Sequence, residues 1–304
     1  MCRRRHTFPA TECYPVTTVD VIRENIASGS FSTVSKAKLA SGGIEVAVKV
    51  SETKLQEPPR FLDVHPSYVP KTIYYSEVRG SIVVEEWLAG ESLYELAKHG
   101  NFGENIAVSC GLKLAVTLRN LARCHHVYHG DITPSNVLVD GLEDDSQLWL
   151  VDFDPWYPIN PLGDVEPPDI SGSMPFLPPE YLNGRLYFNA EKACTYCVGA
   201  VVHYLAFGKP PYCHEYSRET VERLMFGPRH SDDKSTDDIQ RKDYLSFRSM
   251  VSSCQDELPL AGGTLFNDTL KALLMFSPND RIGLDEAIAV LERISTDGQD
   301  KQLA

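Results

Sequence analysis

The stretch HGDITPSN, residues 129–136, decides the fold. It follows a segment, residues 106–124, whose apolar residues recur at helical spacing on more than one face. Asp131 and Asn136 then stand five positions apart in a loop that contains Pro134. A carboxylate and an amide oxygen in such a loop are candidates for proton transfer and for binding a hard cation.

Two shorter segments carry residues of the same kind. In VDFD, residues 151–154, a carboxylate follows an apolar strand predicted over residues 148–151. In VAVK, residues 46–49, Ala47 and Lys49 share one face of a strand because side chains alternate. Lys49 can therefore reach a phosphate group beside a flat base that rests on Ala47.

In this order, the three segments resemble the protein-kinase signatures V-A-I-K, H-R-D-x-x-x-x-N and D-F-G. Residues 172–180 resemble the segment that ends in A-P-E, and residues 86–90 resemble the hinge. Arg281 matches the arginine that pairs with the A-P-E glutamate, here Glu180. The resemblance runs from about residue 21 to residue 293. It implies an α+β, two-lobed protein-kinase-like fold with a small β-rich N-lobe and a larger helical C-lobe.

The expected domain organisation is an irregular lead-in over residues 1–20, an N-lobe over 21–88 and a C-lobe over 89–304. The polar residues 227–243 are interpreted as a surface insert. Alternation and β-branched composition predict strands in the N-lobe, and helical periodicity predicts helices after residue 90. The predicted strands cover residues 21–26, 33–38, 44–50, 72–76 and 82–85, and the predicted helices cover 106–124, 194–207, 265–276 and 284–294.

The resemblance implies ATP and Mg²⁺ as cofactors. Asp131 would accept the proton of the substrate hydroxyl, Lys49 would hold the α- and β-phosphates, and Asn136 with Asp152 would ligate the metal. Ser173 stands where serine/threonine kinases carry a hydroxyl residue, which favours that class over tyrosine kinases. The implied nucleotide-binding residues are Ala27, Ser28, Gly29, Ser30, Val34, Ala47, Lys49, Glu86 and Ser92.

Several positions depart from the family pattern. Only Gly29 survives from the glycine-rich loop. Gly130 replaces the arginine that meets an activation-loop phosphate, which predicts activity without loop phosphorylation. Thr133 replaces a lysine that neutralises the γ-phosphate. Cys194 replaces an aspartate that normally accepts from the catalytic-loop backbone, so another group must satisfy that backbone.

The glutamate partner of Lys49 is hard to find, because Pro58 and Pro59 interrupt the interval where its helix would lie. We expect Glu85, just before the hinge, to line the nucleotide pocket and pair with Lys49. The alternative is a shifted alignment, with Glu85 exposed and a neighbouring valine at that position. The site left open beside Lys49 leaves room for an activating partner.

The chain has 29 Lys and Arg against 42 Asp and Glu, a net charge of −13. This balance argues against non-specific nucleic-acid binding and against docking on anionic lipid. The acidic residues Asp164, Glu166 and Asp169 predict protein substrates of basic character. No apolar stretch approaches about 18 residues and no secretory signal is visible, so we expect an intracellular, cytoplasmic protein.

The leading interpretation is therefore an active, divergent serine/threonine protein kinase. A pseudokinase, which would hold nucleotide or a partner without catalysis, is the main alternative. A kinase-fold enzyme acting on a small molecule is a third, although the A-P-E-like segment at residues 172–180 is typical of peptide docking.

Overall fold

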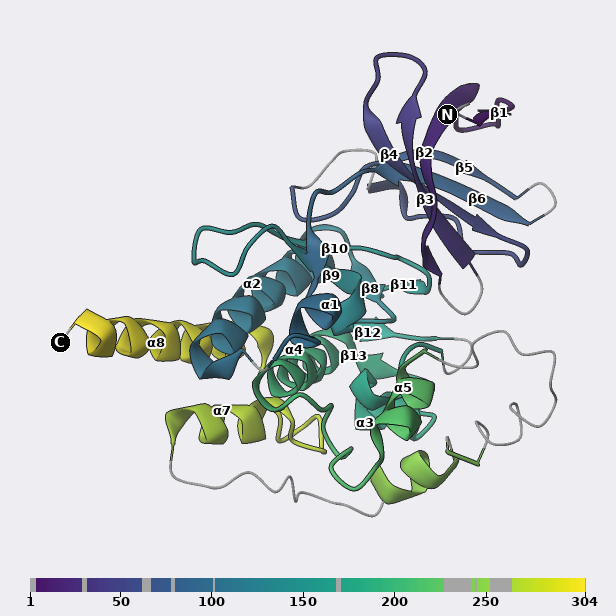
Figure 1. Ribbon diagram of the computed structural model, residues 1–304. Helices are drawn as coiled ribbons and strands as arrows, with labels where there is room; N and C mark the ends of the chain where they lie inside the picture. Colours follow the sequence, from purple (N-terminus) through teal and green to yellow (C-terminus); the bar gives the residue numbers. More distant parts are fainter. Residues whose placement is uncertain are drawn as a thin grey trace. The chain divides into compact units, whose positions relative to one another are not determined.

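The computed structural model divides the chain into two units, an N-terminal unit, Met1–Ala89, and a C-terminal unit, Gly90–Ala304 (Figure 1). The structure describes residues 4–28, 32–61, 67–77, 80–100, 102–167, 171–226, 242–243, 245–251 and 264–303. Gly29, Ser30 and Asp169 lie outside the described residues, as does most of the predicted insert. The predicted α+β fold, with a β-rich first part and a helical second part, is confirmed.

The N-terminal unit is built on one antiparallel sheet with strand order β1-β2-β3-β4-β6-β5. All five predicted strands are present, and their ends differ from the predicted ones by no more than four residues. The strands are β1 (Arg5–Phe8), β2 (Thr17–Ser28), β3 (Ser32–Leu39), β4 (Glu45–Ser51), β5 (Thr72–Ser76) and β6 (Ser81–Glu86).

The expectation that residues 1–20 form an irregular lead-in was wrong. Strand β1 pairs with the start of β2, and the register runs from Arg5 opposite Asp20 to Phe8 opposite Thr17. The strand escapes pattern analysis because it is four residues long and buries only Phe8. That ring stacks on Tyr74 of β5 with centroids 5.3 Å apart, so the hairpin is part of the unit's core.

The connection between β4 and β5 contains no α-helix in the part that the structure describes, residues 52–61 and 67–71. Pro58 and Pro59 are buried there. Leu55 ties this segment to the sheet, because its N–H donates to Ser81 Oγ over 2.8 Å and its carbonyl accepts from Tyr75 Oη over 2.9 Å. A proline-containing segment is therefore tied to β5 and β6 here.

The C-terminal unit is organised around two long buried helices, α2 (Gly103–Cys124) and α4 (Ala190–Phe207), which pack against each other. Helix α4 starts four residues before the predicted position because Asn189 caps it, accepting from Lys192 N. Helix α8 (Leu284–Leu303) packs on α2, and α7 (Leu265–Leu273) packs on α4 (Figure 1). The shorter helices are α1 (Leu93–Ala97), α3 (Pro179–Leu182) and α5 (Arg218–Phe226).

Short paired strands position the loops of the C-terminal unit. Strand β8 (Val127–His129) pairs with β11 (Trp156–Pro158), and β12 (Asp164–Val165) pairs with β13 (Phe188–Asn189). The remaining short elements are β7 (Glu91–Ser92), β9 (Val137–Val139), β10 (Leu148–Leu150) and the 3₁₀ helices η2 (Pro134–Asn136) and η3 (Met174–Phe176). Among the described helices, none is both long enough and apolar enough to cross a bilayer.

Candidate active site

The loop between β8 and β9 closes around the carboxylate of Asp131. One carboxylate oxygen, Oδ1, accepts from Ser173 N over 2.7 Å. The other, Oδ2, accepts from Asn136 Nδ2 over 3.0 Å, and the same amide donates to the Asp131 backbone carbonyl over 2.8 Å. The structure thus brings together Asp131, Asn136 and Ser173, three residues singled out from the sequence.

The His129 side chain connects this loop to the end of β10 by two hydrogen bonds. Its Nδ1 accepts from Asp131 N over 3.1 Å, so the neutral ring carries its proton on Nε2, which lies 3.0 Å from Val151 O. The ring also packs edge-on against Phe153, with centroids 4.7 Å apart. His129 is therefore a positioning residue that ties the loop to the segment containing Asp152.

The pKa of Asp131 is raised, chiefly by burial of its carboxyl group. The negative charge of Asp152 raises it further, while the hydrogen bond from Ser173 opposes the shift. A carboxylate with a raised pKa is a better proton acceptor than an ordinary one.

Asn136 and Asp152 have the chemistry of a hard-cation site. The Asn136 amide nitrogen is committed to Asp131, which leaves its amide oxygen for a ligand. Asp152 follows β10 with φ of 63°, a left-handed conformation that costs energy in a residue other than glycine. Among the described residues, no three His, Cys, Asp or Glu side chains form a metal site by themselves. The two oxygens suit a cation that takes its other ligands from phosphate and water.

Gly130 occupies a position with no room for a side chain. A β-carbon there would lie 2.7 Å from Tyr157 Cε2 and 2.8 Å from Pro155 Cγ. Tyr157 and Pro155 thus fill the space beside the loop, and the sequence did not reveal this. The residue is a glycine because β11 lies directly against it.

The catalytic-loop backbone is satisfied without an aspartate from α4. The Gly130 N–H donates to Pro155 O over 2.8 Å, and the Asp131 N–H donates to His129 Nδ1. Cys194 is fully buried in α4, where its burial raises its pKa well above that of a free thiol. The neighbouring strand end and the histidine therefore supply the acceptors that Cys194 does not.

Thr133 is buried and contributes no charge to the loop. Its backbone carbonyl accepts from Asn136 N over 3.1 Å and so helps to form the 3₁₀ turn that carries the asparagine. In this structure, the residue at the family's lysine position is therefore part of the loop's framework.

In the N-terminal unit, strand register defines the face that carries Lys49. Val34 and Val83 lie opposite Lys49 on the neighbouring strands, and Glu85 lies opposite Ala47. Residues opposite each other in antiparallel strands point to the same side, so these five residues share one face. Glu85 is diagonal to Lys49 and half-buried. Their pairing stays a prediction.

The other expected nucleotide-binding residues are placed as follows. Ala27 and Ser28 lie at the end of β2, opposite Val34 and Thr33. The backbone N–H of Glu86 donates to Lys71 O over 2.9 Å. Ser92 caps helix α1 by accepting from Glu95 N over 3.1 Å. A helix-capping role thus accounts for the Ser92 hydroxyl.

Glu180 and Arg281 form a buried, two-pronged ion pair, although they are far apart in the sequence. The guanidinium nitrogens lie 2.7 and 2.9 Å from the two carboxylate oxygens. Arg281 also donates to the carbonyls of Met275 and Lys192. The pair therefore joins helix α3 to the segment that precedes α8.

An aspartate hydrogen-bonded to an asparagine five residues later, followed in the chain by a second carboxylate after a strand, is the pattern typical of phosphoryl-transfer sites. The comparison with known proteins agrees, because residues 21–290 match the family described as "Protein kinase domain". Since this match covers most of the chain, the protein belongs to the protein kinase family. Members of this family generally use ATP and a divalent metal.

Three relatives illustrate the similarity. The chain is 29% identical over 202 residues to Serine/threonine-protein kinase ATG1a of Arabidopsis thaliana, covering 62% of this chain and 31% of the relative. It is 27% identical over 195 residues to Aurora/IPL1-related protein kinase 2 of Caenorhabditis briggsae, covering 63% and 59%. It is 28% identical over 193 residues to Aurora kinase B-A of Xenopus laevis, covering 62% and 49%. The chain thus spans between about a third and three-fifths of these relatives.

Proposed function

We propose that this protein is an active, ATP- and Mg²⁺-dependent kinase that phosphorylates serine and threonine hydroxyls of protein substrates. The observation that carries the proposal is the setting of Asp131, whose two carboxylate oxygens are oriented by Ser173 and Asn136. A carboxylate oriented in this way is prepared to take a proton from a substrate hydroxyl.

The proposed roles follow from the chemistry of each side chain. Asp131 accepts the hydroxyl proton, and Asn136 and Asp152 hold Mg²⁺, which would neutralise charge on the transferred phosphoryl group. Lys49 binds the α- and β-phosphates, and Ala47 lies under the base. Because phosphoryl transfer depends mostly on positioning and charge, these few groups suffice for the reaction.

A magnesium–ATP assay with protein substrates tests the proposal. The chain should phosphorylate serine and threonine residues, and Asp131→Asn should reduce the rate by at least about a hundredfold, within the range for loss of a general base. Activity that persists in Asp131→Asn would identify a contaminant. Absence of turnover together with a nucleotide-induced rise in Tm would favour the pseudokinase alternative. Phosphotyrosine as the main product would contradict the serine/threonine assignment.

We also propose that the kinase does not require phosphorylation of its activation loop. In kinases switched by that modification, a cation meets the new phosphate. Here Gly130 has no side chain, and Pro155 and Tyr157 fill the space beside it. Enzyme treated with a phosphatase before the assay should retain its full rate. A loss of rate on dephosphorylation would overturn this part of the proposal.

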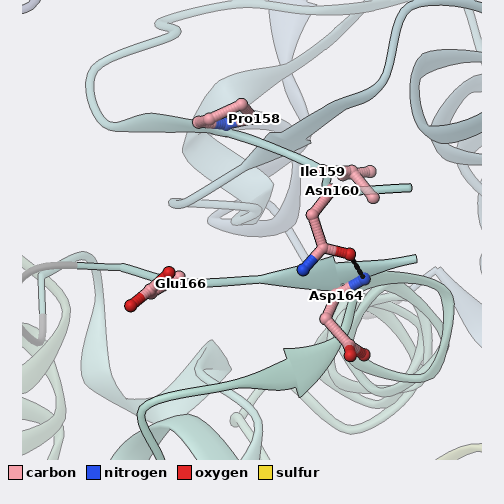
Figure 2. A pocket seen from close by; sticks show the side chains of 5 residues that line it. All are labelled: Pro158, Ile159, Asn160, Asp164 and Glu166. Carbon is pink, nitrogen blue, oxygen red and sulfur yellow. Dashed lines mark hydrogen bonds between the residues drawn. The ribbon is translucent and has the colours of Figure 1, made fainter. Parts of the chain in front are cut away.

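We propose that the kinase prefers protein substrates of basic sequence. Pro158, Ile159, Asn160, Asp164 and Glu166 line a cavity of about 200 Å³, and two of them are acidic (Figure 2). Asn160 shapes it, because its side-chain oxygen accepts from Asp164 N over 3.0 Å (Figure 2). Glu166→Gln should raise KM for arginine-containing peptides but not for neutral ones. An equal effect on both peptides would contradict this specificity.

Pairing of Glu85 with Lys49 is proposed from the strand register. Diagonal neighbours on one face lie about 7–8 Å apart, within reach of two long side chains. Glu85→Gln should weaken ATP binding, while unchanged ATP affinity and turnover would refute the pairing.

An activating partner is proposed beside the segment between β4 and β5, where the family usually has a helix. Adding this partner would raise the activity of the isolated chain without changing that of Asp131→Asn.

A further inference from the structure

Three hydroxyl groups meet where the activation segment returns to the catalytic loop. Tyr157 Oη lies 2.7 Å from Ser171 Oγ and 3.2 Å from Tyr181 Oη. The backbone N–H of Ser171 donates to Tyr181 Oη over 3.1 Å. We call these three residues the hydroxyl clasp.

The clasp joins parts of the chain that are otherwise separate. Tyr157 belongs to β11, Tyr181 belongs to α3, and Ser171 lies between them near the end of the activation segment. Both tyrosine rings are buried: Tyr157 stacks on Tyr128 with centroids 6.4 Å apart, and Tyr181 packs on Phe188 at 5.2 Å. The rings are therefore fixed by packing, and Ser171 is the segment residue they hold.

The Tyr157 hydroxyl of the clasp stays protonated and neutral. Burial is the main cause that raises the pKa of Tyr157 far above that of a free phenol. The hydrogen bonds of Tyr157 with Ser171 and Tyr181 can therefore hold this segment without a phosphate group or an arginine.

Ser171 of the clasp lies two residues before Ser173, whose backbone N–H is hydrogen-bonded to the Asp131 carboxylate. After Ser171, Gly172 passes so close to the catalytic loop that a β-carbon on it would lie 2.7 Å from Gly130 O. The next residue, Ser173, donates its N–H to Asp131 Oδ1. The position of the Ser173 N–H therefore depends on where Ser171 is held.

We infer that Tyr157, Ser171 and Tyr181 are positioning residues that hold the Ser173 N–H on Asp131, in place of a phosphate–arginine pair. The consequence for catalysis rests on the proposed kinase function. The consequence for the Ser173 N–H does not, since it concerns only how the segment is held.

The test compares Tyr157→Phe and Ser171→Ala with Tyr187→Phe, which removes an exposed phenol nearby in the same unit. Two quantities are measured: amide hydrogen exchange of the peptide containing Gly172 and Ser173, and kcat with KM for ATP. Each clasp variant should exchange about tenfold faster and lose about tenfold in kcat, the size of one lost hydrogen bond, while KM for ATP changes less than about twofold. Ser171→Thr, which keeps the hydroxyl, should restore both values, and Tyr187→Phe should change neither.

Unchanged hydrogen exchange in the clasp variants would overturn the inference, whatever their activity. Faster exchange with unchanged kcat would also overturn it, because the segment would then be held without positioning Asp131. If the parent chain has no kinase activity, the proposed function fails separately. The amide hydrogen-exchange measurement then decides by itself whether the clasp holds the Ser173 N–H.

Discussion

Gly172 lies directly against the backbone of Gly130, since a β-carbon added to Gly172 would be 2.7 Å from the Gly130 carbonyl oxygen. Gly172 also has φ of 101°, a conformation that other residues rarely adopt. The catalytic loop and the end of the activation segment therefore approach more closely than side chains would allow.

Gly172→Ala should for this reason lower kcat by at least about tenfold, because the shift needed to relieve the clash moves Ser173 away from Asp131. Gly163→Ala is the matched control: φ is 84° there, but the nearest atom would be 3.6 Å from the new β-carbon. Steady-state kinetics of both variants test the idea. Equal losses in the two would assign the effect to backbone conformation and contradict a role for close approach.

Cys194→Asp, which restores the residue usual in the family, should destabilise this protein. The Gly130 and Asp131 amides already have acceptors, so the new carboxylate would be buried without a donor from them. We expect a loss of about 2–4 kcal/mol in the free energy of unfolding, measured in urea, against about 1 kcal/mol for Cys194→Ser. Wild-type stability in Cys194→Asp would mean that the loop amides still need an acceptor from α4.

Arg281→Met should cost about 3–5 kcal/mol of stability, because it leaves the buried carboxylate of Glu180 without its partner. The double variant Glu180→Leu with Arg281→Met removes both charges and should recover part of that loss. Thermal and denaturant unfolding of the two variants measure the difference. A double variant less stable than Arg281→Met would contradict this account.

Acid should destabilise the C-terminal unit through His203. Burial is the largest cause that lowers its pKa to about 4, and the charge of nearby His214 lowers it further. The unfolded chain binds a proton below about pH 6.5 while the folded chain does not, so stability is lost as the pH falls from about 6.5 towards 4. Between pH 7 and pH 5 the loss attributable to this group is about 2 kcal/mol.

His203→Gln should remove that part of the pH dependence, whatever it does to stability at pH 7. His99→Gln, at an exposed histidine, should leave the pH dependence as it is. Urea unfolding at several pH values provides the measurement. An identical slope in His203→Gln and the parent would show that other groups control the acid response.

Phe8→Ala should destabilise the N-terminal unit by about 3–5 kcal/mol, since it removes a buried ring that stacks on Tyr74. Val16→Ala, in the same hairpin but 60% exposed, should change stability by less than about 0.5 kcal/mol. Equal effects of the two substitutions would mean that the hairpin does not belong to the core.

Much of this fold could be predicted because its signals are local. Alternation along residues 44–50 predicts the strand that carries Lys49, and helical periodicity predicts α2 and α4. The spacing of Asp131 and Asn136 predicts a shared site, and the structure joins them by a hydrogen bond. Strand β1 lacks such a signal, because only one of its four residues is buried.

The remaining features depend on contacts that span the sequence. The sequence shows that Gly130 has no side chain. It does not show that Pro155 and Tyr157 occupy the space around it, because that depends on the pairing of β8 with β11. Likewise, the absence of an aspartate at Cys194 shows that an acceptor is needed without showing which carbonyl supplies it. The hydroxyl clasp combines three residues with no shared periodicity, so only the fold brings them together.

The hairpin that contains β1 has a consequence for handling the protein. The family match starts at residue 21, so a clone trimmed to the matched region would lose Phe8, Tyr14 and the strand that pairs with the start of β2. Trimming would uncover the apolar surface around Tyr74, on which Phe8 and Tyr14 pack. Exposed apolar surface promotes self-association, so the shortened protein should aggregate more readily than the longer one.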